Sequence, residues 1–398
     1  MVTRERKEQL KDENIKKSRR QDNKQHCQKI LEGIGKFDNT TAERAIWELL
    51  QNARDLSNHA HVEITLDEDR FIFSHNGKPF DYDTLTSLIK QVSSEEKEDP
   101  NAAGQFGTGF MTTHKFSRKI QINGCMKIDE KEYVEINNFS LDRTDNEIQK
   151  MIDKMADQLG YVDDLYDKPT TSTPRAETSF IYELDDAHFP AAEQGVTAAF
   201  CLMPYVMVFN ERIEKVIIND NKNHQHNIFT KKSSQALDPD VNLHVLTIGT
   251  SDGNDRNLFY LQSEDRKDMI ILPLKSMNEA MDITGVPRLF IFFPLLGTHN
   301  FGFNYIFHSE RFFPEEPRNA IVLPEDNIDK LAKYESDVKV LNDMFQMLFA
   351  YLDKYGKEIK NAKAENEESA MKFFNVNIEN IERNLVDELN NLENNIDI

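Results

Sequence analysis

The chain has 398 residues, of which 39% are hydrophobic and 29% charged, and its formal net charge is −21. A field of this sign repels nucleic acid from most of the surface, so the composition disfavours a nucleic-acid-binding role. No apolar run approaches the ~18 residues that span a bilayer, and no apolar stretch follows the basic N-terminal residues, so we expect neither a membrane protein nor a secretory signal. The three cysteines (Cys27, Cys125 and Cys201) have neither metal spacing nor a disulfide framework, which suits a reducing cytoplasm.

Composition and hydrophobic pattern divide the chain into four segments. Residues 1–30 are polar and helical in pattern, and because acidic side chains interrupt the basic ones, we expect a solvated arm rather than a nucleic-acid patch. A first domain is expected over 31–205, a second over 206–326, and a helical segment over 327–398. The last part, 361–398, has sparse apolar positions typical of a marginal amphipathic helix that needs a partner helix or an effector protein.

The first domain is expected to mix helices with paired strands. Thr40 and Glu43 have the spacing of a capping box at the start of a helix that ends near residue 57. A short helical pattern begins at residue 81 and gives way to a polar loop before residue 104, and a second helix is expected over 145–160. Alternating apolar residues predict strands at 61–66, 71–73, 119–122, 126–128, 133–136, 180–184 and 196–203.

The second domain is expected to be rich in strands and aromatic residues. The predicted strands are 216–218, 243–248, 257–262, 269–274 and 289–293, the last of them fully apolar. Its aromatic side chains favour a domain core over a surface that binds client proteins; they are Phe290, Phe292, Phe293, Phe301, Phe303, Phe307, Phe312 and Phe313.

The helix before residue 57 carries two stripes. Its apolar residues fall at the spacing of one buried face, whereas Glu48, Asn52 and Asp55 share a second face. Carboxylate and amide oxygens in this arrangement can hold a hydrated metal ion and a water molecule. An exposed polar stripe is the alternative when this helix is considered alone.

A glycine-rich stretch runs from Gly104 to Phe110 and precedes a helix-compatible segment. Glycines at the start of a helix let backbone N–H groups approach a phosphate closely. The stretch lacks the Lys-Ser/Thr ending of a P-loop, and it is not the first turn of a βαβ unit, so neither of those nucleotide folds is expected.

The order of these motifs resembles that of the GHKL (Bergerat-fold) ATPases, which include ninety-kilodalton heat-shock chaperones, topoisomerase and mismatch-repair ATPases, and sensor histidine kinases. A Glu-x-x-x-Asn-x-x-Asp helix comes first, then a strand that ends at Asn76 and Gly77, then a loop and the glycine box. The run from His75 to Phe80 and the run from Phe209 to Ile213 are similar to the sacsin-type branch and its bacterial multidomain members.

The resemblance implies an α+β fold, with a Bergerat-type sandwich of a mixed sheet and helices on one face. An α/β transducer-like domain and C-terminal helices would follow. It implies that Glu48 is the general base for the attacking water and that Asn52 ligates Mg²⁺ at the phosphates of ATP. Residues 81–103 would form a lid. The other residues that it places around the nucleotide are Asp55, His75, Asn76, Gly77, Phe80, Gly104, Gln105, Phe106, Gly107, Thr108, Gly109, Phe110 and Thr197.

His75 departs from the family pattern. Most members have there an aspartate that accepts a hydrogen bond from the adenine amino group, and a neutral imidazole can accept that bond in only one tautomer. Asp81 or Asp55 could take the role instead. Thr197 would donate to an acceptor near the base, and a strand hydroxyl with local bonds is its alternative.

In this family a lysine or arginine side chain of the second domain often reaches the γ-phosphate of the nucleotide. The resemblance favours Arg318, followed by Arg311 and then Lys275, with ordinary surface ion pairing as the alternative for each. Glu48 disfavours a kinase, because sensor kinases generally carry asparagine there and need an upstream phosphoacceptor histidine; His26, in the polar arm, is a poor match for it.

The function expected from the sequence is Mg²⁺-dependent ATP binding with slow hydrolysis, which drives lid closure and switching between monomer and homodimer. The resemblance sets this ATPase in the cytoplasm and within a bacterial, defence-type system. A heat-shock-type chaperone, a nucleic-acid remodeller and a nucleotide sensor without turnover are the alternatives.

Overall fold

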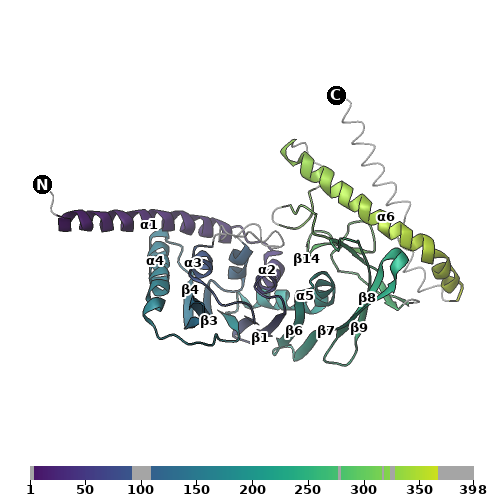
Figure 1. Ribbon diagram of the computed structural model, residues 1–398, viewed down its shortest axis with the longest axis horizontal. Coiled ribbons are helices and arrows are strands. Elements are labelled where there is room, and N and C mark those ends of the chain that lie inside the picture. The colour runs from purple at the N-terminus through teal and green to yellow at the C-terminus, as the bar shows by residue number, and fades with distance from the viewer. Residues whose placement is uncertain (1–3, 92–108, 277–278, 316–317, 323–327, 366–398) are drawn as a thin grey trace. The chain divides into compact units, whose positions relative to one another are not determined.

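The chain is a mixed α+β protein, shown as a computed structural model in Figure 1. It divides into two compact units. The first comprises Met1–Cys201 and Arg212–Ile228, and the second comprises Leu202–Glu211 and Phe229–Ile398. The division therefore differs from the one expected at residue 205, because a strand just beyond it belongs to the first unit. The structure describes residues 4–91, 109–276, 279–315, 318–322 and 328–365.

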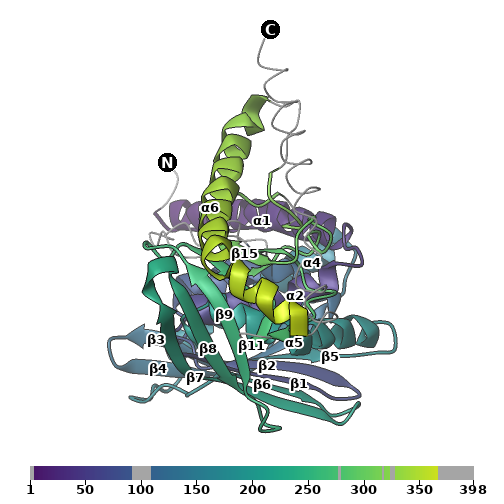
Figure 2. The same ribbon diagram turned by 90° about the vertical axis from the view of Figure 1, so that its right-hand side faces the viewer.

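The first unit is a mixed sheet with helices on one face (Figures 1 and 2). The strand order is β6-β1-β2-β5-β3-β4, in which β1 and β6 are parallel and the other pairs antiparallel. The strands are β1 (Ala60–Leu66), β2 (Arg70–His75), β3 (Lys119–Asp129), β4 (Glu132–Asp142), β5 (Thr178–Glu183) and β6 (Ile213–Asp220). The helices are α1 (Arg4–Ile34), α2 (Thr41–Asp55), α3 (Tyr82–Lys90) and α4 (Ile148–Asp164), with the 3₁₀ turns η1 (Gly109–Lys115) and η2 (Leu165–Asp167).

Most elements of this unit follow from the sequence pattern. The alternation in β1 and β2 places Val62, Ile64 and Phe73 in the core, and the expected turn after Leu66 closes their hairpin through the Asp67 N–H and the Arg70 carbonyl. The segment expected as a polar arm lies largely within the helix α1, whose described side chains are exposed before Asn23. The expected strands 119–122 and 126–128 are parts of one continuous strand, β3.

The expected capping box at the start of α2 is wrong. Thr40 precedes the helix without a side-chain cap hydrogen bond. Instead, the Asp38 carboxylate accepts from the backbone N–H groups of Thr40 and Thr41, at 2.9 and 3.0 Å, and from both hydroxyls. Asp38 thereby satisfies the first donors of the helix, which is the service that a capping side chain provides.

The expected strand 196–203 is also wrong, because these residues lie within the helix α5 (Phe189–Phe209). Short apolar runs do not distinguish a strand from a buried helix by pattern alone. Among the described residues, α5 is the only helix long and apolar enough to cross a membrane, but 67% of its apolar window is buried inside the protein. This is the burial pattern of a core helix.

The strands of the second unit follow in the same hydrogen-bonded strand order, as β14-β13-β15-β10-β9-β8-β7, with β7 next to β6. The strands are β7 (Gln225–Asp238), which begins in the first unit, β8 (Leu243–Gly249), β9 (Arg256–Gln262), β10 (Asp268–Ile271), β13 (Leu289–Ile291), β14 (Phe293–Pro294) and β15 (Ile306–Ser309). A separate pair consists of β11 (Leu274–Ser276) and β12 (Glu279–Ala280), and η3 (Pro239–Val241) precedes β8. The helix α6 (Ile328–Glu365) matches the helical pattern expected from residue 327.

The apolar run 289–293 is two strands rather than one. Phe292 has a positive φ of 61°, which ends β13 and starts the short β14. Its N–H donates to His308 Nδ1 at 3.1 Å, and its carbonyl accepts from the Asn210 amide at 2.7 Å. Buried side chains therefore hold a conformation that is unfavourable for a bulky residue.

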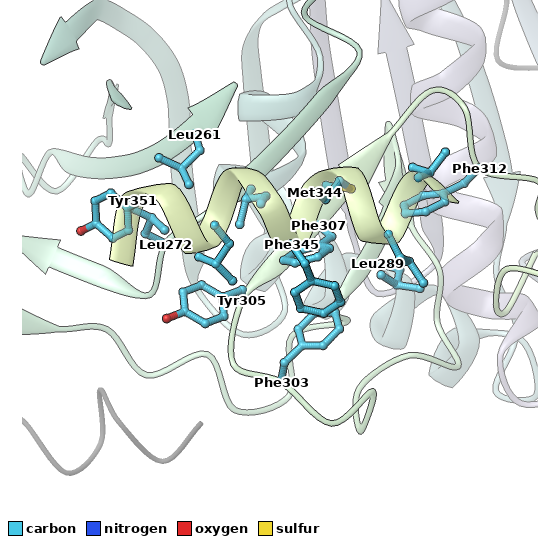
Figure 3. Packing of buried hydrophobic residues seen from close by; sticks show 14 of the residues in the cluster. Leu261, Leu272, Leu289, Phe303, Tyr305, Phe307, Phe312, Met344, Phe345 and Tyr351 are labelled. Atoms are coloured by element: carbon cyan, nitrogen blue, oxygen red, sulfur yellow. The ribbon is translucent and has the colours of Figure 1, made fainter. Parts of the chain in front are cut away.

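The aromatic segment of the second unit is core, as expected. Figure 3 shows Phe303, Phe307 and Phe345 packed together beneath α6, with ring centroids of Phe303 and Phe307 4.6 Å apart. Phe307 is fully buried, and Leu289, Phe312 and Met344 belong to the same cluster. Phe313 is the exception, with 40% of its surface exposed.

This packing predicts that Phe307→Ala destabilises the second unit by about 3–5 kcal/mol, because it removes a buried ring and leaves a cavity. Phe349→Ala is the matched control, since Phe349 stacks on Phe345 but is 39% exposed. We expect the control to cost less than about 1 kcal/mol. Urea unfolding followed by circular dichroism measures both, and equal losses would contradict this account of the core.

Candidate functional site

The polar stripe of α2 lies on its less buried side. Glu48, Asn52 and Asp55 are each partly exposed. The apolar residues of the helix face the core, as the sequence pattern predicts; the buried ones include Ile46, Leu49, Leu50 and Ala53. The three residues therefore share the less buried face of the helix, on which the Asp55 side chain is held by its neighbour Arg54.

The end of the glycine box lies against this stripe. A Cβ atom at Gly109 would lie 1.9 Å from Oε2 of Glu48 and 2.5 Å from its carboxyl carbon. No side chain fits there while Glu48 keeps its position, so the backbone of Gly109 passes directly over the carboxylate. Gly109 also opens η1, so the two motifs that the sequence separates by about 60 residues meet at the start of a helical turn.

The segment from His75 to Lys78 lies beside the C-terminal end of α2. The Lys78 N–H donates to the carbonyl of Leu56 at 2.9 Å. A Cβ atom at Gly77 would lie 2.7 Å from Nδ1 of His75 and 2.8 Å from Cβ of Leu56. The absence of a side chain at Gly77 lets the turn approach α2 this closely.

The Asn76 side chain fastens the turn to the start of β1. Its Oδ1 accepts the N–H of His61 at 2.8 Å, and its Nδ2 donates to the carbonyl of His59 at 2.9 Å. Both ends of the amide are thus used by the backbone. The structure gives Asn76 a positioning task within the motif, whereas the sequence indicated a nucleotide contact.

His75 is buried and neutral. It is 2% exposed, and burial lowers the pKa of its imidazole to about 4. Its Nδ1 accepts the N–H of Gly77 at 3.0 Å, so in the neutral ring the proton lies on Nε2. The ring stacks on Phe180 with centroids 6.1 Å apart, and Phe180 also contacts Phe110 at 5.5 Å. His75 therefore presents a donor at Nε2, not the acceptor that the resemblance requires for an adenine amino group.

Asp81 and Asp55, the alternative acceptors for the adenine amino group, both already accept hydrogen bonds. Asp81 caps α3, where its Oδ1 accepts the Thr84 N–H at 2.7 Å. Asp55 accepts from Nη1 of Arg54 at 2.9 Å, and both side chains are largely buried.

Phe80 forms a bridge with Met126, where its N–H donates to the Cys125 carbonyl at 3.0 Å.

Thr197 lies on an exposed face of α5, so its expected position on a strand is wrong. The strand hydroxyl beside His75 belongs instead to Thr178 at the start of β5. Thr178 is 4% exposed and directly opposite His75 in the β2–β5 pairing. The sequence signal that could have identified it was the start of the strand predicted at residue 180, two positions after Thr178.

Gln91 and His114 form a buried polar pair beyond Phe110, which the sequence did not predict. His114 is 1% exposed; burial and the charge of Arg143 lower its pKa to about 3. Its Nε2 lies 2.5 Å from Nε2 of Gln91, and its Nδ1 lies 3.3 Å from the Ser117 carbonyl. With Nδ1 donating, Nε2 is the acceptor for the Gln91 amide. This contact joins the end of α3 to η1.

Five residues of the glycine box lie outside the described residues: Gly104, Gln105, Phe106, Gly107 and Thr108. The same holds for the part of the expected lid from residue 92 onward. Within the described ranges, no group of three or more His, Cys, Asp or Glu side chains is placed to hold a metal ion.

The cationic candidates lie in the second unit. The guanidinium of Arg311 is engaged, because it pairs with Asp268 and lies 3.2 Å from Asp343 of α6. These carboxylates raise the pKa of Arg311 further. Lys275 pairs with Glu279 at 2.9 Å. Arg318 has a positive φ of 70° in the loop before α6, and its side chain is partly exposed.

Comparison of the sequence with protein-family models and with curated proteins gives no match. The membership suggested by the motifs therefore stays a prediction.

Burial of a neutral His75 predicts a pH dependence of stability. The pKa is about 4 in the folded protein and about 6.5 in the unfolded chain, so the stabilisation from His75 is complete above pH 6.5 and is lost as the pH falls towards 4. The expected slope from this residue between pH 6 and 5 is about 1 kcal/mol per pH unit.

His75→Gln should make the measured slope shallower by about that amount. His224→Asn, at an exposed position with positive φ, is the control for loss of an imidazole. Urea unfolding at several pH values is the measurement, and an unchanged slope in His75→Gln would show that His75 is charged or exposed in the native state.

Proposed function

We propose that the first unit binds ATP with Mg²⁺ and hydrolyses it slowly. The observation that carries this proposal is the contact between Gly109 and Glu48, where a backbone without a side chain lies over a carboxylate. A phosphate held by backbone N–H groups at the start of η1 would lie within reach of that carboxylate. Glu48 would then accept the proton of the attacking water.

Asn52 lies one helical turn after Glu48 on the same face, so its amide oxygen would face the same phosphates. The residues present fit a hydrated Mg²⁺ ion, which prefers oxygen ligands and keeps several waters. Mg²⁺ would supply neutralisation of the phosphate charge, which phosphoryl transfer requires in addition to positioning. Switching between nucleotide-bound and free states, with association of two copies, would be the output of such a site.

The chaperone alternative would use the aromatic residues of the second unit and residues 361–398 to hold clients. Most of the aromatic residues of the second unit are buried in its core, and Phe303 and Phe307 are 6% and 0% exposed, so they do not support it. A nucleotide sensor without turnover is a further alternative, since it would use the same phosphate contacts. The two differ in whether Glu48 acts as a base.

Glu48→Gln should retain nucleotide binding and lower phosphate release by about 10²–10⁴-fold, the usual contribution of a general base. Binding is followed by thermal stabilisation with Mg²⁺ and either ATP or GTP, and turnover by phosphate release. Wild-type protein that releases no more phosphate than Glu48→Gln would support the sensor. Lack of stabilisation by both nucleotides would reject the site.

Gly109→Ala tests the contact itself. The added methyl group would meet the Glu48 carboxylate, which is the far end of a flexible side chain, so we expect the fold to survive and the carboxylate to move. Phosphate release should fall at least ~10-fold, because displacement of a catalytic group by about 1 Å has an effect of this size or larger. Gly160→Ala on α4 is the control, since no atom lies within 4 Å of its added Cβ. Equal activity of the two variants would falsify the assigned role of the contact.

A further inference from the structure

The buried contact between Gln91 and His114 joins two elements of the first unit. Gln91 follows α3, where its left-handed backbone (φ 52°) ends the helix and its N–H donates to the Ser87 carbonyl. His114 is the penultimate residue of η1. The two side-chain nitrogens lie 2.5 Å apart, and the residues are 5% and 1% exposed, so water cannot readily replace their hydrogen bond.

The direction of this hydrogen bond is fixed by the other side of the ring. Nδ1 of His114 donates to the Ser117 carbonyl, so in the neutral imidazole Nε2 carries the lone pair. Burial and the charges of Arg143 and Arg118 keep the ring neutral, because they lower its pKa to about 3. His114 therefore needs a donor at position 91, and the Gln91 amide supplies it.

The end of α3 is itself fixed, by the fully buried side chain of Arg143. Nη2 of Arg143 donates to the Ile89 carbonyl at 2.5 Å, in the last turn of the helix. Its Nη1 donates to Oε1 of Gln158 on α4 at 2.7 Å and to the Asp142 carbonyl at 2.9 Å. The guanidinium thus joins α3 to α4 and to the end of β4, so Gln91 extends from a backbone that is held on several sides.

The other partner of the contact leads directly to the candidate site. The Thr112 hydroxyl donates to the Gly109 carbonyl at 2.8 Å, which braces the first turn of η1. The Phe110 ring meets the His114 ring edge-on, with centroids 6.4 Å apart. At the start of the same turn the backbone of Gly109 lies over the Glu48 carboxylate. A shift of His114 would therefore be passed along this short, braced turn to Gly109.

We propose that His114 is the positioning residue of η1: through Gln91 it fastens this turn to α3, and the turn holds the backbone of Gly109 over Glu48. His114 acts through the backbone of η1 and is not a catalytic group. Its effect on turnover rests on the proposed function, whereas its effect on η1 does not.

Three variants separate the contact with Gln91 from the loss of a buried ring. A glutamine side chain extends its amide to about the position of Nε2, and an asparagine side chain only to about that of Nδ1. His114→Gln therefore keeps an acceptor for Gln91, whereas His114→Asn keeps a donor for Ser117 and loses the contact with Gln91. Gln91→Met removes the donor at nearly constant size, and Gln149→Met is its control, because Gln149 is an exposed amide on α4.

Hydrogen exchange of the full chain measures the effect on η1. The Phe116 N–H, which donates to the Thr113 carbonyl at 3.0 Å, reports on the end of the turn. In Gln91→Met and His114→Asn we expect its protection factor to fall by tenfold or more, and in His114→Gln to stay close to that of wild-type protein. Wild-type protection in Gln91→Met, or equal losses in the two His114 variants, would overturn the proposal.

Turnover is measured on the same proteins as phosphate release. Gln91→Met and His114→Asn should lower kcat by about tenfold, as expected for a misplaced catalytic group, with little change in KM for the nucleotide. His114→Gln should restore most of the loss, and the double variant with both Gln91→Met and His114→Asn should be no slower than His114→Asn. Additive effects, or an equal loss in Gln149→Met, would overturn the link between the contact and the site.

Failure of the proposal and failure of the proposed function give different results. Urea unfolding of each variant distinguishes local loosening of η1 from a global loss of stability. Absence of turnover in wild-type protein would overturn the proposed hydrolysis and leave the exchange experiment to decide whether His114 fastens η1 to α3.

Discussion

The arrangement of the candidate site depends on one steric constraint, the lack of room for a side chain at Gly109. The carboxylate of Glu48 occupies the space in which a Cβ atom of residue 109 would lie. The backbone of η1 therefore lies directly against the Glu48 side chain of α2. Glu48 is on a helix whose opposite face is buried, and Gly109 begins a turn whose next residues, Phe110 to His114, are buried as well. The buried residues of both elements fix their backbones, so the approach of η1 to α2 follows from the packing of the core.

A second approach of backbone to α2 lies at Gly77, and it has a different basis. The Asn76 side chain holds the turn to β1 through hydrogen bonds to two backbone groups. The Gly77 N–H donates to the neutral ring of His75. The low pKa of His75 follows from its burial, next to Phe180. The turn is therefore held by hydrogen bonds within it and to β1, and the neutral ring of His75 offers a donor at Nε2.

The second unit is built on other principles. An aromatic cluster packed against α6 supplies its core, and the segment before α6 is held both by the buried carboxylate of Asp337 and by Ile321 in the apolar cluster. A buried acid that serves two backbone donors is stabilised by them and destabilised by loss of water, so its ionisation lies near neutral pH. This unit thus combines an apolar core with a buried polar attachment at Asp337.

The sequence by itself determined the α+β character, the two faces of α2, the hairpin of β1 and β2, and the aromatic core, because these depend on periodicity and on the high cost of exposing apolar residues. It also placed Glu48, Asn52 and Gly109 in one group by motif order. It did not determine that 196–203 is helical, since a short apolar run fits both structures, nor that Asp38 rather than Thr40 caps α2. Only the tertiary structure decided that Thr178 and not Thr197 neighbours His75, because strand register brings together residues about 100 positions apart. It likewise decided the tautomer of His75 and the attachment of Asp337, which depend on backbone groups that carry no signature in the sequence.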